Sequence, residues 1–183
     1  MLEIAVLMFA LLLTPKGIWL PIICLGAIAL VIPGAYATWF GAPFLPTSHP
    51  ILARMISMAR LKKGEIAYDL GCGDGRVLLA AAHAGAKATG YEFSVLMYLY
   101  CKLRCLFQRD VRVKYGNFWT KDFRDADVIF CYLLTDTMKT FKAKIWPQLK
   151  PGCRVVSHSF RMQDIVPDEE GEKVVVYVKK ANA

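Results

Sequence analysis

Three glycines at alternate positions constrain this chain more than any other feature of its sequence. Gly71, Gly73 and Gly75 lie in the run DLGCGDG, between the strand-like residues 65–68 and the helix-like residues 76–82. Because glycine lacks a Cβ atom, such a loop turns sharply and lets a ligand approach its backbone. The helix that follows offers free N–H groups and a partial positive charge. The pattern therefore predicts a binding loop, with a spacing that differs from the G-x-G-x-x-G of dinucleotide-binding enzymes.

Further segments with the pattern of buried strands follow this loop. Residues 86–92 end in Glu92, about seventeen residues after the loop, where a carboxylate can accept hydrogen bonds from two ribose hydroxyls. Residues 111–115 alternate as a third strand, residues 127–133 read as a buried fourth, and the turn at 149–152 introduces a fifth at 153–157. Together with the strand before the loop, these segments make five candidate strands.

The glycine loop, Glu92 and the order of the strands together resemble the class I S-adenosylmethionine (SAM)-dependent methyltransferases. This resemblance implies an α/β fold with a Rossmann-like sheet and helices on both of its faces, SAM as the cofactor and methyl transfer as the reaction. Asn117 stands where this family usually has an aspartate near the adenine amino group. The cofactor contacts that the resemblance implies are Asp69, Gly71, Cys72, Gly73, Gly75, Glu92, Asn117 and Phe118.

Most of residues 43–161 resemble a narrower group, the membrane-anchored protein lysine methyltransferases that modify the ATP synthase c-subunit and the adenine nucleotide translocase. The resemblance rests on residues 43–47, the glycine loop, residues 90–92, and residues 154–157 with Phe160. It implies N-methylation of a lysine in an integral-membrane protein. The chain departs from this group at Asn117 and after the fourth strand, and these departures concern the acceptor more than the cofactor.

The candidate acceptor residues are those that leave the fourth and fifth strands, because ligands of such sheets bind outside the carboxyl ends of the strands. Tyr132 is the candidate catalytic residue, since its hydroxyl can orient an amine. The other candidates for substrate contact are Thr47, Thr135, Asp136, His158 and Phe160. Ordinary loop or core packing is the alternative for each. Asp127 begins the fourth strand and is expected at the opposite end of the sheet.

An uncharged apolar segment precedes this domain. Residues 17–53 carry no formal charge, and a helix over residues 18–40 would be about 34 Å long, enough to cross the hydrocarbon core of a bilayer. A buried globular helix is the alternative. We predict a membrane segment at 1–42, with one helix at 18–40 either alone or in a hairpin with 1–13. Residues 43–63 are then a linker with a helix before the loop, and residues 64–183 are the methyltransferase domain.

The distribution of charge predicts how the domain lies relative to a bilayer. Lys16 precedes the apolar run and four basic residues follow it within 54–63, which places the catalytic domain on the cytoplasmic side, or on the matrix side of an organelle. The net charge of +8 fits attraction to anionic lipids, and a solvated basic surface is the alternative. Nucleic acid is not predicted as a partner, because no recognised binding motif accompanies the charge.

Two other functions are compatible with this sequence. A lipid or quinone methyltransferase would have an apolar acceptor cavity near Phe44, Trp119 and Phe160. A non-catalytic membrane module would have kept the fold without turnover, although the intact glycine loop argues against it.

The cysteines and the C-terminal part complete the sequence-based expectations. No metal site is predicted, because the six cysteines form no C-x-x-C pair and the three histidines are scattered. The cysteines are expected to be reduced, with Cys101 and Cys105 on one face of a helix. Residues 160–183 leave room for six strands in total, or for a very short seventh.

Overall fold

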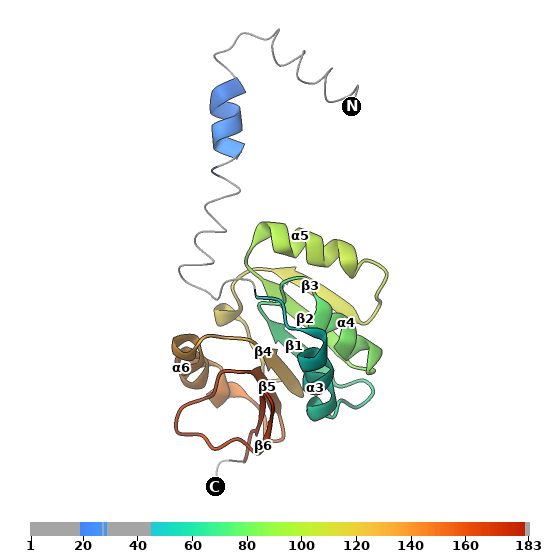
Figure 1. Ribbon diagram of the computed structural model, residues 1–183, viewed down its shortest axis with the longest axis vertical. Helices are drawn as coiled ribbons and strands as arrows, with labels where there is room; N and C mark the ends of the chain where they lie inside the picture. Colours follow the sequence, from blue (N-terminus) through green and yellow to red (C-terminus); the bar gives the residue numbers. More distant parts are fainter. Residues whose placement is uncertain (1–18, 27, 29–44, 182–183) are drawn as a thin grey trace.

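A computed structural model describes residues 19–26, 28 and 45–181 of the chain (Figure 1). Residues 45–181 contain a seven-stranded sheet in the order β3-β2-β1-β4-β5-β7-β6. Strands β1 to β5 pair in parallel, whereas β7 is antiparallel to β5 and β6 is antiparallel to β7. The strands are β1 (Ile66–Leu70), β2 (Lys87–Glu92), β3 (Val111–Tyr115), β4 (Val128–Cys131), β5 (Arg154–His158), β6 (Glu169–Gly171) and β7 (Val174–Val178). The short β6 makes the strand count seven, the second of the two expected numbers.

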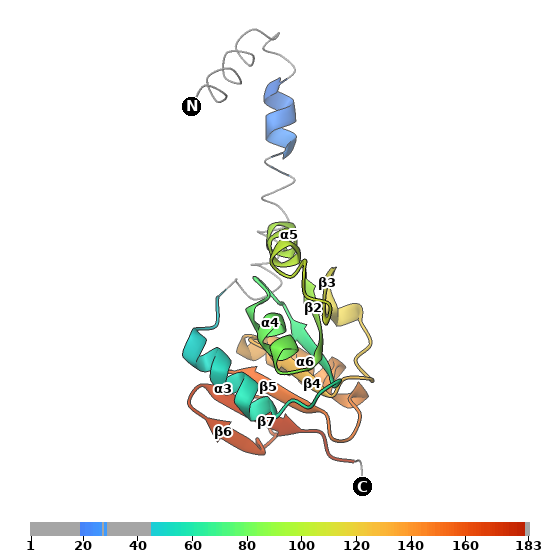
Figure 2. The same ribbon diagram turned by 90° about the vertical axis from the view of Figure 1, so that its right-hand side faces the viewer.

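Helices cover both faces of the sheet, as predicted (Figures 1 and 2). Alternate residues of β4 face opposite sides: Val128 and Phe130 belong to one hydrophobic core, and Ile129 and Cys131 to the other. Because both sides are buried, β4 is a continuous apolar run. The first core packs against α3 (His49–Ala59), α4 (Arg76–His83) and α5 (Val95–Arg104), and the second packs against α6 (Thr135–Lys144) and the 3-10 turn η2 (Trp146–Gln148). The 3-10 turn η1 (Phe118–Thr120) follows β3.

The predicted membrane helix at 18–40 lies mostly outside the described residues. Residues 19–26 and 28 are helical, and their side chains are exposed. In the part of the chain that the structure describes, no helix combines the length and the apolar character needed to cross a bilayer. The first arm of the predicted hairpin and Phe44 also lie outside the described residues.

Asp127 lies at the amino end of β4, which is the expected position. Its Oδ2 atom accepts a hydrogen bond from the backbone N–H of Ile66 at 2.8 Å, and its Oδ1 atom pairs with Nζ of Lys150 at 2.5 Å. The carboxylate thereby connects the starts of β1 and β4 to the turn before β5. Asp127 is a structural residue at the edge of the sheet opposite the carboxyl ends of the parallel strands.

Candidate cofactor and acceptor site

The glycine loop follows β1 and is held by the end of β2. The backbone N–H groups of Gly71 and Cys72 both donate to the carbonyl of Tyr91, at 3.0 and 3.1 Å. The three loop glycines have φ angles of +81°, +52° and +78°, which residues with a side chain rarely adopt. No atom lies within 4 Å of the position that a Cβ atom would take at Gly71. At Gly71 the loop therefore presents open backbone at the carboxyl end of β1.

Glu92 is fixed against this loop from the end of β2. Its Oε2 atom accepts a hydrogen bond from the N–H of Gly73 at 2.9 Å, and its Oε1 atom accepts one from the N–H of Ser94 at 2.7 Å. A carboxylate has about four acceptor positions, so both oxygens keep acceptor capacity. The carboxylate is thus oriented in advance for a ligand with two neighbouring hydroxyl groups, such as a ribose.

Asp69 lies at the end of β1 and is 6 % exposed. Within the described residues, its side chain receives no hydrogen bond from the protein. Burial, together with the charges of Glu92 and Asp74, raises the pKa of Asp69 to about 8. A buried carboxyl group without a partner is costly, and a cation beside it would lower that cost. SAM carries an ammonium group and a sulfonium group. The buried carboxyl group of Asp69 and the oriented carboxylate of Glu92 therefore fit SAM.

The raised pKa of Asp69 makes the stability of the cofactor-free enzyme depend on pH. The folded protein binds this proton more tightly than the unfolded chain, whose carboxyl group has the ordinary pKa of 3.8. The unfolding free energy therefore falls as the pH rises from about 4 to about 8, by at most about 1.4 kcal/mol per unit from this group. Asp69→Asn removes this slope. Urea unfolding between pH 5 and pH 8 is expected to show Asp69→Asn gaining stability relative to wild type, while Asp164→Asn on the surface shows no such trend. A constant difference at all pH values would contradict the assignment.

Asp74 connects the glycine loop to two arginines. Its Oδ2 atom pairs with Arg76 at 2.8 Å and with Arg104 of α5 at 2.6 Å. Arg76 also donates from Nη1 to the backbone carbonyl of Thr47 at 2.6 Å. Burial alone would raise the pKa of Asp74, but the hydrogen bonds from Arg76 and the charge of Arg104 outweigh it and lower the pKa. This network fixes the loop to α5 and to the segment before α3.

Cysteine side chains pack beneath the loop. The Sγ atom of Cys72 lies 3.8 Å from that of Cys101, so Cys72 faces α5 with its side chain. Cys101 and Cys105 lie together against Gly75, as their spacing on a helix predicts. All cysteines of the described residues are free.

Asn117 and Phe118 follow the carboxyl end of β3, where Tyr115 pairs with Glu92 in the sheet. The Oδ1 atom of Asn117 accepts a hydrogen bond from the N–H of Trp119 at 2.9 Å and so begins η1. Phe118 packs against Trp119, with ring centroids 4.5 Å apart. Their contact with the adenine of a bound cofactor stays a prediction.

Aromatic side chains from β4 and β5 form a cluster at the carboxyl ends of these strands. The ring of Tyr132 lies 3.9 Å from that of His158 and 5.9 Å from that of Phe160, between centroids. The Oγ1 atom of Thr47 lies 3.4 Å from Nδ1 of His158. Burial, with the charge of Lys173, lowers the pKa of His158, so its imidazole is neutral near pH 7. The structure thus brings together four of the six residues predicted around the acceptor.

Thr135 and Asp136 lie at the start of α6 and are exposed. Asp136 pairs with Lys139 at 2.8 Å, and 92 % of its side chain is exposed. Within the described residues, neither residue forms a hydrogen bond with the aromatic cluster. A role of these two residues in the acceptor site stays a prediction.

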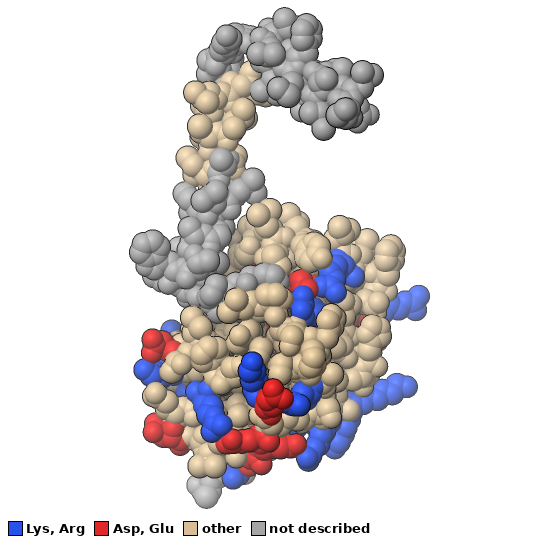
Figure 3. Space-filling model, viewed as in Figure 1, with Lys and Arg blue, Asp and Glu red and all other residues tan. Residues whose placement is uncertain are grey.

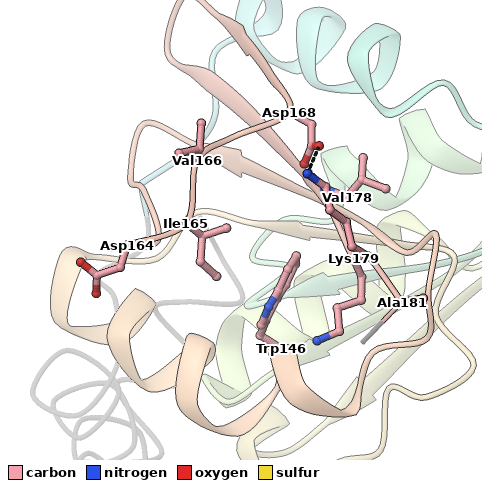
Figure 4. A pocket seen from close by; sticks show the side chains of 9 residues that line it. Trp146, Asp164, Ile165, Val166, Asp168, Val178, Lys179 and Ala181 are labelled. Carbon is pink, nitrogen blue, oxygen red and sulfur yellow. Dashed lines mark hydrogen bonds and ion pairs between the residues drawn. The ribbon is translucent and has the colours of Figure 1, made fainter. Parts of the chain in front are cut away.

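A cavity of about 360 Å³ lies elsewhere, between η2, the loop before β6 and the end of β7 (Figure 4). Trp146, Ile165 and Lys179 are among the residues that line it. Val178, which also lines it, pairs with Arg154 at the start of β5. This cavity therefore lies at the edge of the sheet opposite the aromatic cluster and does not belong to the candidate site.

The strand order, the glycine loop with its buried acid, and the oriented carboxylate at the end of β2 define a class I SAM-dependent methyltransferase. When bound, SAM supplies a methyl group activated on sulfur. The chain belongs to the family of the ANTKMT methyltransferase domain, whose model matches residues 69–169.

Two relatives and one solved structure show which methyltransferases this chain is similar to. The chain is 36 % identical over 135 residues to a protein-lysine N-methyltransferase of Saccharolobus islandicus, covering 69 % of this chain and 82 % of that protein. It is 26 % identical over 129 residues to the lysine N-methyltransferase of the ATP synthase c-subunit from Xenopus laevis, with 69 % of this chain but only 57 % of that protein covered. Among solved structures, an RNA methyltransferase from Salinibacter ruber in complex with S-adenosyl-L-homocysteine matches with a TM-score of 0.72 and 28 % identity, covering 76 % of this chain and 96 % of that one.

Proposed function

We propose that this enzyme N-methylates a lysine side chain of a membrane protein. The observation that carries the proposal is the 36 % identity over most of the length of a protein-lysine N-methyltransferase. The name of the Xenopus laevis relative gives the c-subunit of ATP synthase, a membrane protein, as its acceptor. The uncharged apolar run at 18–40 supports a membrane helix that holds the enzyme beside such acceptors. The catalytic domain would then lie on the cytoplasmic or matrix side.

The aromatic cluster suits the chemistry of a lysine acceptor. A lysine, with an ordinary pKa of about 10.4, must lose a proton before its nitrogen can attack a methyl group. The apolar surroundings that Tyr132, Phe160 and a neutral His158 provide would disfavour the charged ammonium and so favour the neutral amine. The hydroxyl of Tyr132 can accept a hydrogen bond from the amine and so direct its lone pair toward the cofactor. Orientation of this kind supplies much of the rate in a single displacement step.

Substitutions of Tyr132 test this assignment. We expect Tyr132→Phe to lower the rate of methyl transfer about tenfold, because one orienting hydrogen bond is lost, and Tyr132→Ala to lower it about 100-fold or more. Initial rates with labelled SAM measure the effect. The affinity for S-adenosylhomocysteine is expected to stay unchanged, since the ring lies at the end of β4 and not in the glycine loop. Trp146→Phe, at the opposite edge of the sheet, is the matched control. Wild-type rates in both Tyr132 variants would contradict the role of this residue.

A lipid or quinone acceptor is the competing hypothesis. An enzyme with such an acceptor would use the same cofactor site, but the methyl group would end in the lipid fraction of the membranes and not in a protein. Extraction of labelled membranes with organic solvent distinguishes the two, because a methylated lysine stays with the protein. The label in RNA should be measured as well, because the chain is basic and an RNA methyltransferase is among its structural neighbours.

A further inference from the structure

Helix α5 presents large apolar side chains to the outside of the domain. Four of them recur at the spacing i, i+3, i+4 and i+7, which places them on one stripe of the helix. Each of the four is between 50 and 70 % exposed, and the stripe continues into the turn after the helix with two further side chains that are 60 and 91 % exposed. These six residues, here called the α5 stripe, are Leu96, Leu99, Tyr100, Leu103, Leu106 and Phe107.

The opposite side of α5 is also apolar. Cys101 is completely buried there, and Cys105 directly after the helix is 5 % exposed. Packing against the domain therefore uses a face of the helix other than the stripe. A group of exposed apolar side chains of this kind marks an interaction site.

Basic residues accompany the α5 stripe on the helix itself and in the segments before and after β3. Residues 95–121, which run from α5 through β3 to the end of η1, contain six basic residues and one acidic residue. Within the described part of the chain, one of the six, Arg104, forms an ion pair. Figure 3 shows uncharged surface where α5 lies, with Lys and Arg side chains close to it. The six basic residues are Lys102, Arg104, Arg109, Arg112, Lys114 and Lys121, and the acidic residue is Asp110. Two of the six, Arg112 and Lys114, lie on the face of β3 opposite α5, because Val111 and Val113 pack against the first core and Lys114 lies over the ring of Tyr91 in the second.

Helix α5 is attached to the cofactor site at both of its ends. Ser94, its N-cap, donates its N–H to Glu92, and Arg104 in the last turn donates to the backbone carbonyl of Asp74 at 3.0 Å. Through Arg76 the same network reaches Thr47, near the point where the described domain begins. Thr47 belongs to the uncharged run of residues 17–53, so the described end of that run lies beside the network that holds α5.

We propose that the α5 stripe is an interfacial membrane-binding surface. Its leucines and Phe107 would enter the boundary between headgroups and acyl chains, and the basic residues of α5 and of the segments that flank β3 would lie against anionic headgroups. A second copy of the chain is a poorer occupant, because pairing the stripe with itself would bring two basic surfaces together. The inference goes beyond the proposed function, since it concerns how the domain lies on a bilayer and holds whichever acceptor is methylated.

The test measures the accessibility of the stripe in the full-length chain. A thiol is introduced by Leu103→Cys, or by Ala143→Cys on the exposed side of α6 as the control, in a Cys24→Ser background that leaves only buried native cysteines. The proteins are reconstituted into phosphatidylcholine vesicles with about 30 % phosphatidylserine and treated with a water-soluble maleimide. We expect the thiol of Leu103→Cys to react at least about tenfold more slowly than that of Ala143→Cys, and this difference to shrink several-fold in phosphatidylcholine alone.

Three outcomes would overturn the proposal. Equal rates of the two thiols in the anionic vesicles would show that the stripe faces water. Protection that grows with the number of protein molecules per vesicle, and not with phosphatidylserine, would identify a second copy as the occupant. Protection that needs no lipid would show that the stripe is covered by the chain itself. The readout involves no methyl transfer, so it stays independent of the result for the lysine acceptor.

Discussion

Glu92→Ala is expected to raise the dissociation constant for SAM and for S-adenosylhomocysteine about 100-fold or more. The carboxylate is held by the N–H groups of Gly73 and Ser94 and keeps acceptor capacity for two ribose hydroxyls. Hydrogen bonds to a charged group contribute about 1.5–3 kcal/mol each, so the loss of two corresponds to at least a 100-fold change. The N–H of Gly73 also loses its acceptor, which loosens the loop.

Isothermal titration with S-adenosylhomocysteine measures this effect without any acceptor. Glu92→Gln keeps the size of the side chain but not its charge, and we expect an intermediate loss of about tenfold. Glu170→Ala on β6 is the matched control, because that carboxylate pairs with Arg161 on the surface. Near wild-type affinity in Glu92→Ala, in a protein with unchanged circular dichroism, would show that the ribose lies elsewhere.

Gly75→Ala is expected to lower the unfolding free energy by about 3–5 kcal/mol. The residue has a φ of +78°, and a Cβ atom there would lie 2.6 Å from Sγ of Cys101 and 3.1 Å from Sγ of Cys105. The variant therefore combines backbone strain with a clash inside the core between α4 and α5. Neither sulfur can move far, because both cysteines are buried.

Gly64→Ala separates the two causes. Gly64 has a similar φ of +85°, but no atom lies within 4 Å of its Cβ position, so only the backbone strain of about 1–2 kcal/mol applies. The double variant Gly75→Ala with Cys101→Ala removes the closest clash and is expected to recover part of the loss. Urea unfolding of the four proteins measures these differences. Equal losses at the two glycines, with no recovery in the double variant, would contradict the packing between α4 and α5.

Local sequence patterns were enough to predict the strands and the residues at the ends of the strands. Alternation and apolar runs placed β1 to β5 and β7 to within a few residues, and Glu92 was correctly placed at the end of β2, where it contacts the glycine loop. Asp127 was placed at the correct edge of the sheet because strand direction alone decides that position. The convergence of Tyr132, His158 and Phe160 follows from the same rule, since parallel strands end at one edge.

Contacts between segments distant in the sequence could not be predicted in this way. The bonds of Asp74 to Arg104 and of Arg76 to Thr47 depend on how α5 and the segment before α3 lie over the loop. The exposed stripe on α5 was missed for a similar reason. Its leucines and Cys101 are all apolar, so the sequence alone does not indicate which side of the helix faces the domain.

The most direct test of the central claim is the transfer of labelled methyl groups from SAM into membranes of cells that lack this protein. The full-length enzyme is added, with Glu92→Ala as the blank, and the label is separated into protein, organic extract and RNA. The account predicts label in a protein band that is lost when one lysine of that protein is changed to arginine. Label in the organic extract or in RNA, with the protein fraction at the level of the blank, would contradict lysine methylation and leave the cofactor site standing.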